Sequence, residues 1–170
     1  RQTTARLPWL LIGMLGGIGN SMILGNFDTT FAAHPEMALY IPLIGGTGGN
    51  VGTQSSALVV QGLANSSLDA NNTWKQILKE SVVALINATI ISMLVYIYNF
   101  VRFGATATVS YSVSLSLFAV VMFASIFGTL VPMTLEKLKI DPAIATGPFI
   151  SITNDIIGMM LYMGITVLLS

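Results

Sequence analysis

Five apolar segments, separated by short polar connections, dominate the pattern along this chain. Each segment is about as long as the ~20 residues that an α-helix needs to cross ~30 Å of hydrocarbon. A transmembrane β-barrel would instead show segments of about ten residues with alternating polarity. The sequence therefore predicts an all-α membrane protein with five transmembrane helices per chain, at roughly 7–25, 37–64, 77–101, 111–135 and 144–169.

The composition agrees with this pattern. Of the 170 residues, 54% are apolar and 8% are charged, whereas a soluble domain has about 25% charged residues. The chain has no Cys, which excludes disulfides, thiolate metal ligands and cysteine nucleophiles. Because it starts with Arg1 rather than Met, we expect a fragment of a longer protein. All of residues 1–170 are expected to form one transmembrane pore domain.

The basic residues predict how the chain lies across the membrane. Six of the seven flank the N-terminus, the second connection and the fourth, and only Arg102 lies on the other side. Cytoplasmic connections carry an excess of Lys and Arg, so the N-terminus is predicted to be cytoplasmic and the C-terminus extracellular. The six residues are Arg1, Arg6, Lys75, Lys79, Lys137 and Lys139.

The second segment carries five Gly within a dozen positions after Pro42. One interpretation is close helix packing, because small residues let backbones approach in lipid. The other is a distorted or broken helix whose freed carbonyls face a cavity together with Asn50 and Gln54, since irregular backbone at membrane depth is tolerated where it lines a cavity. Five Gly with Pro, Asn and Gln exceed what packing requires, so the sequence favours the cavity.

Asp155 is the acidic residue that lies deep inside an apolar segment. It follows Ile144 by eleven residues, or about 16 Å of helix, which places it near mid-membrane. An ionised carboxylate there costs at least ~2.5–3.5 kcal/mol, and no Lys or Arg lies at a matching depth. A protonated Asp that hydrogen-bonds a neighbouring helix is one interpretation. The favoured one is a water-filled ion path along the face that Asp155 shares with Ser151 and Gly147.

Asp141 stands at the cytoplasmic entrance of the same segment, in IDPAIATGPF. One interpretation is a helix N-cap with Pro142 at the first helical position. Electrostatic focusing of cations at a pore mouth is compatible with that role. Asp141 and Asp155 are fourteen positions apart, close to four helical turns, so both are predicted to lie on nearly one face.

The remaining polar residues point to no enzyme. Asn20 and Asn87 are predicted to hydrogen-bond between helices, and His34 to be solvated in the outer connection. An intramembrane aspartyl protease needs two deep aspartates, a serine protease needs an intramembrane His, and GGTGGNVG lacks the Lys of a phosphate-binding loop. No catalytic residue is therefore predicted.

The ligands on offer are carboxylate, carbonyl, hydroxyl and amide oxygens. These hard ligands favour Mg²⁺, Ca²⁺, Mn²⁺ or an alkali ion over Zn²⁺ or Cu⁺. Mg²⁺ gives up its waters reluctantly, so one carboxylate per chain, doubled by a twofold axis, can hold a hydrated Mg²⁺ through its water shell. The residues alone do not separate Mg²⁺ from the other ions.

A resemblance narrows the choice. The stretches RLPWLLIGMLGG, PLIGGTGGNVGTQSSALVVQGLA and DPAIATGPFISITNDIIGMMLYMG resemble, in order, the transmembrane domain of the MgtE magnesium channel family. The resemblance implies a homodimer whose pore lies on the twofold axis, lined by the second and fifth helices, and which conducts Mg²⁺. Asp155 matches the family's central pore aspartate, Asp141 the acidic residue at the cytoplasmic end, and Asn50 a position beside the pore. The family's usual cytoplasmic regulatory domains have no counterpart in this sequence, so gating by them is not inferred.

The leading hypothesis is a Mg²⁺-selective channel that carries hydrated divalent cations into the cytoplasm. Its metal site is predicted to comprise Asp155, Asp141, Ser151 and Asn50, with Mg²⁺ as permeant and bound ion. Expected partners are a second copy of the chain, the lipid bilayer of a bacterial or archaeal cell, and Mn²⁺ or Co²⁺ besides Mg²⁺, but no nucleic acid. The alternative is a secondary transporter that couples a proton or Na⁺ at Asp155 to a solute. A third reading is a membrane anchor for a regulatory domain.

Overall fold

A computed structural model describes residues 1–33, 35–103, 108–142 and 148–169 of the chain. Within these residues every regular element is a helix, and the prediction of an all-α fold is confirmed. The short helices α2 (Asp28–Ala33) and η1 (Pro35–Tyr40) join α1 to α3, and η2 (Ala70–Asn72) precedes α4. The long helices are α1 (Gln2–Gly25), α3 (Ile41–Ala64), α4 (Thr73–Phe103), α5 (Thr108–Lys137) and α6 (Pro148–Leu169).

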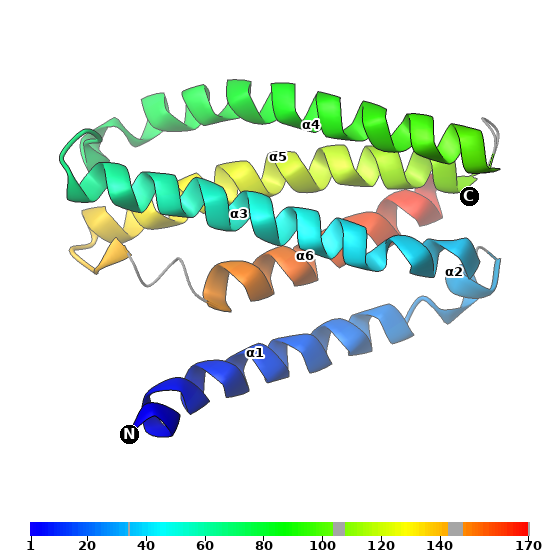
Figure 1. Cartoon of the computed structure of the whole chain (residues 1–170), viewed down its shortest axis with the longest axis horizontal. Coiled ribbons are helices and arrows are strands. Elements are labelled where there is room, and N and C mark those ends of the chain that lie inside the picture. Colours follow the sequence, from blue (N-terminus) through cyan, green and yellow to red (C-terminus); the bar gives the residue numbers. More distant parts are fainter. Residues whose placement is uncertain (34, 104–107, 143–147, 170) are drawn as a thin grey trace.

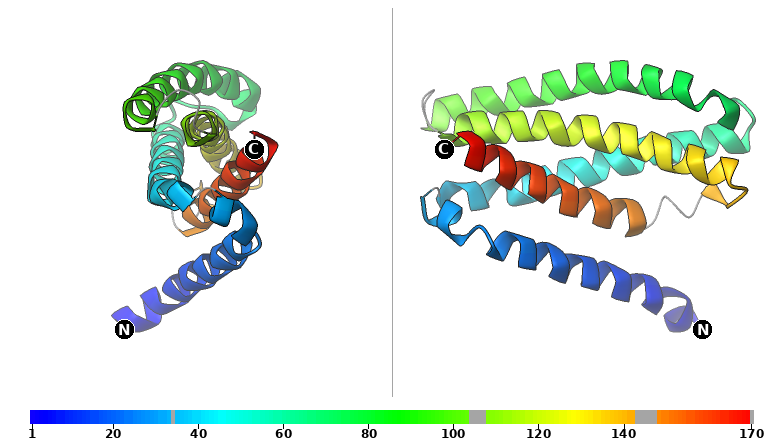
Figure 2. Two further views of the ribbon diagram at one scale, coloured as in Figure 1. Left: turned by 90° about the vertical axis from the view of Figure 1, so that its right-hand side faces the viewer. Right: turned by 180° about the vertical axis from the view of Figure 1, so that it is seen from behind.

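The long helices run side by side and alternate in direction along the chain, so that α1, α4 and α6 point one way and α3 and α5 the other (Figure 1). Helix α5 is central and packs against α3, α4 and α6. Helix α3 also packs against α6. The first helix packs against α6 and otherwise diverges from the bundle, as Figure 2 shows. The bundle thus consists of α3, α4, α5 and α6, and α1 joins it mainly through α6.

Within the described residues, four helices are long and apolar enough to cross a membrane: α1, α4, α5 and α6. The sequence predicts five spans. Helix α3 has 24 residues, the same length as α1, but Gly, Ser, Thr, Asn and Gln recur along it and lower its hydropathy. Its length therefore suits a span, whereas its polar positions need a covered or hydrated surface.

Helix α3 is continuous from Ile41 to Ala64, so the prediction of a broken second helix is wrong. The expected segment begins instead as η1, and Pro42 lies in the first turn of α3. A proline is tolerated there because the amide hydrogen it lacks would have no partner within the helix. Of the five glycines, Gly48 and Gly52 are held in place by close neighbours on other helices.

Two of these glycines pack against other helices. A Cβ on Gly48 would lie 2.8 Å from Cγ1 of Val120 on α5. Gly52 meets the side-chain amide of Asn154 on α6, and a Cβ on Gly128 of α5 would lie 2.7 Å from the Gly52 carbonyl oxygen. Glycine is therefore required where α3 passes between α5 and α6. The packing interpretation holds for this side of α3.

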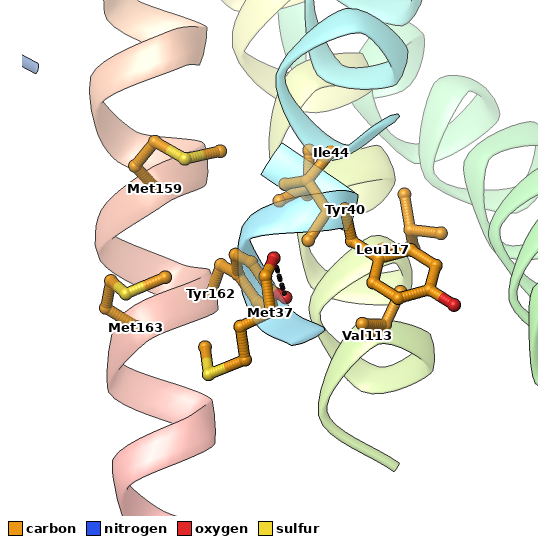
Figure 3. Close-up of a cluster of buried hydrophobic side chains, with 9 residues drawn as sticks. Met37, Tyr40, Ile44, Val113, Leu117, Met159, Tyr162 and Met163 are labelled. Carbon is orange, nitrogen blue, oxygen red and sulfur yellow. Dashed lines mark hydrogen bonds between the residues drawn. The ribbon is translucent and has the colours of Figure 1, made fainter. Parts of the chain in front are cut away.

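The apolar core lies at the end of the bundle where α3 and α5 begin and α6 ends. Figure 3 shows Met37, Tyr40 and Ile44 facing side chains from α5 and α6. The Tyr162 hydroxyl donates a hydrogen bond to the Met37 carbonyl oxygen over 2.8 Å, and Tyr40 donates to Oδ1 of Asn99. These bonds satisfy polar groups that burial would otherwise leave unpaired, at about 1–3 kcal/mol each.

The basic residues gather at the opposite end. Arg1 and Arg6 begin α1, Lys75 and Lys79 lie in the first two turns of α4, and Lys137 and Lys139 lie at the end of α5. The alternating helix directions bring these three pairs to the same end, on the left in Figure 1. Arg102, in the last turn of α4, lies at the other end.

The close contact between α3 and α5 makes a testable prediction. Gly128→Ala should destabilise the protein by about 1–3 kcal/mol, because the added methyl meets a backbone carbonyl that cannot rotate away. Gly164→Ala is the matched control: it is the same change in a helix, and the added Cβ has nothing within 4 Å. Thermal unfolding in detergent should give a lower Tm for Gly128→Ala alone; equal Tm values would contradict the packing.

Candidate functional site

An open groove of about 700 Å³ runs between α3 and α6, and α1 contributes to its wall. Its surface is mixed, with hydroxyl, amide and carboxylate groups beside glycines and apolar side chains. The polar residues that line it are Asn20, Asn50, Thr53, Gln54, Ser151 and Asp155, and the others are Ile41, Gly45, Gly46, Gly49, Ala57 and Met159.

Helical spacing explains which part of α3 faces the groove. Residues 45, 49, 53 and 57 form one row and residues 46, 50 and 54 form the next, each with steps of four. Residues four apart are neighbours on a helix surface, so the two rows make one continuous face. Gly48 and Gly52 lie on the other side, against α5 and α6. The cavity interpretation therefore holds for the groove side of α3, although the helix is unbroken.

Asp155 projects from α6 into this groove and is half-buried. It follows Pro148 by seven residues, which places it about 10 Å from the start of the described helix. A Cβ on Gly45 would lie 3.6 Å from Oδ1 of Asp155, so glycine keeps α3 from crowding the carboxylate. Among the described residues no hydrogen bond or ion pair reaches this carboxylate. Its free oxygens face the groove.

Three of the four predicted site residues come together in the groove. Ser151 lies one turn before Asp155 and is exposed to the groove, and Asn50 is exposed across it on α3. Asp141 is not among the lining residues; it is exposed and lies seven positions before α6 begins at Pro148. The predicted shared face of Asp141 and Asp155 depends on residues 143–147. These residues, which include Gly147, lie outside the described part of the chain, and so does His34.

The prediction of interhelical hydrogen bonds for Asn20 and Asn87 is wrong within the described residues. Asn87 is exposed on α4. Asn20 lines the groove, and its Oδ1 atom is buried without a hydrogen-bond partner. Asn20 follows Gly16 by one helical turn, and Gly16 lies on the side of α1 that packs closely against α6. The sequence alone gave no signal of this position, because it does not show that α6 is the neighbour of α1.

The groove offers single oxygen ligands rather than a closed metal cage. No group of three or more His, Asp or Glu side chains that could hold a metal occurs in the described ranges. An octahedral Mg²⁺ keeps most of its six water ligands, and six waters occupy about 180 Å³ at ~30 Å³ each. The groove volume of about 700 Å³ exceeds this several-fold. Its geometry thus suits an ion held through its water shell.

Comparison with known proteins bears on this arrangement. The MgtE family model, described as a divalent cation transporter, matches residues 41–165 and so includes α3 and most of α6. The chain belongs to the MgtE family. The resemblance inferred from the sequence motifs is confirmed, and the apolar helices agree with the integral membrane character of that family.

Curated relatives of this MgtE-family chain carry the name magnesium transporter MgtE. The chain is 33% identical to the Bacillus subtilis protein over 160 residues, which are 94% of this chain and 35% of that protein. Its identity to the Thermus thermophilus protein is also 33%, over 97% of this chain and 36% of the relative. The Enterococcus faecalis protein is 29% identical over the same share of this chain. The chain thus spans about a third of the length of these relatives.

Hydration of the groove can be tested by cysteine accessibility. The chain has no native Cys, so Ser151→Cys introduces a single thiol on the groove surface. A charged, water-soluble methanethiosulfonate should modify it at least tenfold faster than it modifies Ile86→Cys, which is also exposed in the isolated chain but lies on the apolar outer side of α4. Mass spectrometry of the protein in liposomes measures both rates. Equal rates would contradict a hydrated groove.

Proposed function

We propose that this chain forms a homodimeric membrane channel that conducts hydrated Mg²⁺, with the groove of each copy contributing half of the pore. The observation that carries the proposal is the meeting of Asp155, Ser151 and Asn50 on one open groove of an MgtE-family chain. Relatives of this chain are named magnesium transporters, and the oxygen ligands in the groove are of the hard type that Mg²⁺ prefers.

The polarity of α3 supports the fifth span and the dimer together. A helix that presents Asn50, Thr53 and Gln54 to lipid would expose side-chain amides and hydroxyls to hydrocarbon, at several kcal/mol for each unsatisfied group. A second copy placed groove to groove encloses these residues in a shared aqueous path. A twofold axis along the path also brings two Asp155 carboxylates to face each other across it.

A pair of Asp155 carboxylates suits a hydrated divalent cation. Two negative charges balance the charge of one Mg²⁺, which removes the cost of a lone carboxylate at membrane depth. The ion keeps its waters because Mg²⁺ dehydrates reluctantly, and the waters bridge to Ser151 and Asn50. Asp141, outside the groove, serves in this proposal as an entrance site that raises the local cation concentration.

The orientation follows from the clustering of basic residues. Six of seven lie at one end of the bundle, and this end is proposed to be cytoplasmic under the positive-inside rule. The N-terminus and Asp141 then lie on the cytoplasmic side, and the C-terminus lies outside. Cations enter from the C-terminal end and move toward the cytoplasm down their electrochemical gradient.

The proposed homodimer can be tested by measuring the molar mass of the purified protein. Light scattering of the purified chain in detergent, corrected for bound detergent, should give about twice the 18.1 kDa of one chain. Gln54→Trp should lower the dimer fraction, because a bulky side chain on the exposed groove face of α3 obstructs a second copy. A monomer that still conducts Mg²⁺ would contradict the shared pore.

The site is tested by Mg²⁺ flux into liposomes that contain a fluorescent Mg²⁺ indicator. Asp155→Asn keeps the size of the side chain but removes its charge, and it should reduce flux at least tenfold. Asp28→Asn, the same change in the exposed first turn of α2, should leave flux unchanged. An Asp155→Asn variant with wild-type flux would remove Asp155 from the site.

The same liposomes separate the channel from a coupled transporter. For a channel, a negative interior potential should drive Mg²⁺ entry, whereas a proton or Na⁺ gradient at zero potential should have no effect. If uptake instead requires the proton or Na⁺ gradient, Asp155 acts as the coupling site of a secondary transporter.

A further inference from the structure

We infer that Asn20 of α1 is an additional cation-facing residue: its side-chain carbonyl oxygen accepts hydrogen bonds from the water shell of a divalent cation held at Asp155. This inference rests on the proposed function of the groove and adds a third helix to the ion path. It gives α1 a direct part in ion binding as well as in anchoring the chain in lipid.

Packing between α1 and α6 sets the height of Asn20. A Cβ on Gly16 would lie 2.6 Å from Cγ2 of Ile152, so the two helices touch closely at this level. Both helices run in the same direction (Figure 1). Asn20 lies four residues beyond Gly16, and Asp155 lies three residues beyond Ile152. At 1.5 Å per residue, both side chains start within about 2 Å of the same level.

The groove brings the two side chains to one space. Asn20 and Asp155 both line it, together with Ser151 and Gln54. Asn20 is thus the residue of α1 that lines the groove, and α1 itself packs against α6. The water shell of an ion at Asp155 would therefore meet oxygen acceptors on α1, α3 and α6.

The state of the amide oxygen points to a hydrogen-bond donor in the groove. Oδ1 of Asn20 is buried and has no hydrogen-bond partner in the described part of the chain. Native structures rarely leave a buried acceptor unpaired. The Asn20 side chain lines the groove, so a rotation about χ2 that turns its oxygen toward the groove gives that oxygen a water donor. Waters that coordinate a cation point their hydrogens away from it. Such waters are strong donors, and they are directed at an acceptor such as Oδ1 of Asn20.

This role differs from that of Asp155. The carboxylate supplies charge, whereas the amide supplies a neutral acceptor that recognises the outer face of the water shell. Asn20 should therefore affect the affinity for a hydrated ion more than the maximal rate. The exposed Asn87 on α4 lies outside the groove-lining set and provides a matched control.

The experiment compares Asn20→Ala, Asn20→Asp, Asn87→Ala and Asp155→Asn with the wild-type chain in liposomes. Asn20→Ala should raise the apparent KM for Mg²⁺ about tenfold, equivalent to about 1.4 kcal/mol, with maximal flux within twofold of wild type. Asn20→Asp, which is nearly the same size and adds a negative charge, should lower the apparent KM. Asn87→Ala should match the wild-type chain.

A second readout separates ligation from folding. Binding of Mn²⁺ to the protein in detergent, followed by the free Mn²⁺ EPR signal, should weaken for Asn20→Ala by the same factor as the KM. If both Asn20 variants lower the Tm but leave Mn²⁺ affinity and KM unchanged, the role of Asn20 is structural and the inference is overturned.

The outcomes also distinguish this inference from the proposed function. If Asn20→Ala matches the wild type while Asp155→Asn loses flux, the inference is wrong and the cation path stands. If the wild-type chain conducts no Mg²⁺, or Asp155→Asn is fully active, the proposed function fails and the inference fails with it.

Discussion

The close approach of α3 to α5 and α6 is the constraint on which the rest of the structure depends. Gly52 accepts contact from two sides, with Gly128 against its carbonyl oxygen and the Asn154 amide against its Cα. A side chain at either glycine would force the helices apart. With the packing side of α3 fixed against α5 and α6, its opposite side is left to Gly45, Asn50 and Gln54. The groove is thus a direct consequence of glycine packing.

The polarity of the bundle is reversed relative to a water-soluble protein. Small hydroxyl residues of α5 are buried, among them Ser112, Ser116 and Thr129, whereas α4 exposes large apolar residues such as Ile86, Ile90 and Leu94. In lipid there is little hydrophobic force between helices, so small residues and hydrogen bonds hold them together. The bond from Ser55 of α3 to the Glu80 carboxylate of α4, at 2.9 Å, is one such link.

Two neighbouring residues on α6 have different roles: one packs against another helix, and the other faces the groove. Asn154 is 2% exposed and meets α3 at Gly52, whereas Asp155 projects into the groove near Gly45. Successive residues on a helix point about 100° apart, so one helix can pack tightly and line a path at the same level. The contact of Ile152 with Gly16 then brings α1 to the same region. A single turn of α6 therefore sets the spacing of three helices around the carboxylate.

The sequence by itself determined the helical class, because apolar runs of membrane length leave the backbone no other way to satisfy its hydrogen bonds in lipid. It also singled out Asp155 by its depth, and Ser151 by its spacing of one turn on a single helix. These are local properties with a fixed period.

Only the tertiary structure decided which glycines of α3 pack and which line the groove, and that α3 is unbroken. It also showed that Asn20, predicted to hydrogen-bond to a neighbouring helix, instead lines the groove together with Asp155. These features depend on which helices are neighbours and on their rotation about their own axes. Residues more than a hundred positions apart set that arrangement through close contacts, such as Gly16 with Ile152, and helical periodicity along one segment carries no information about its partner.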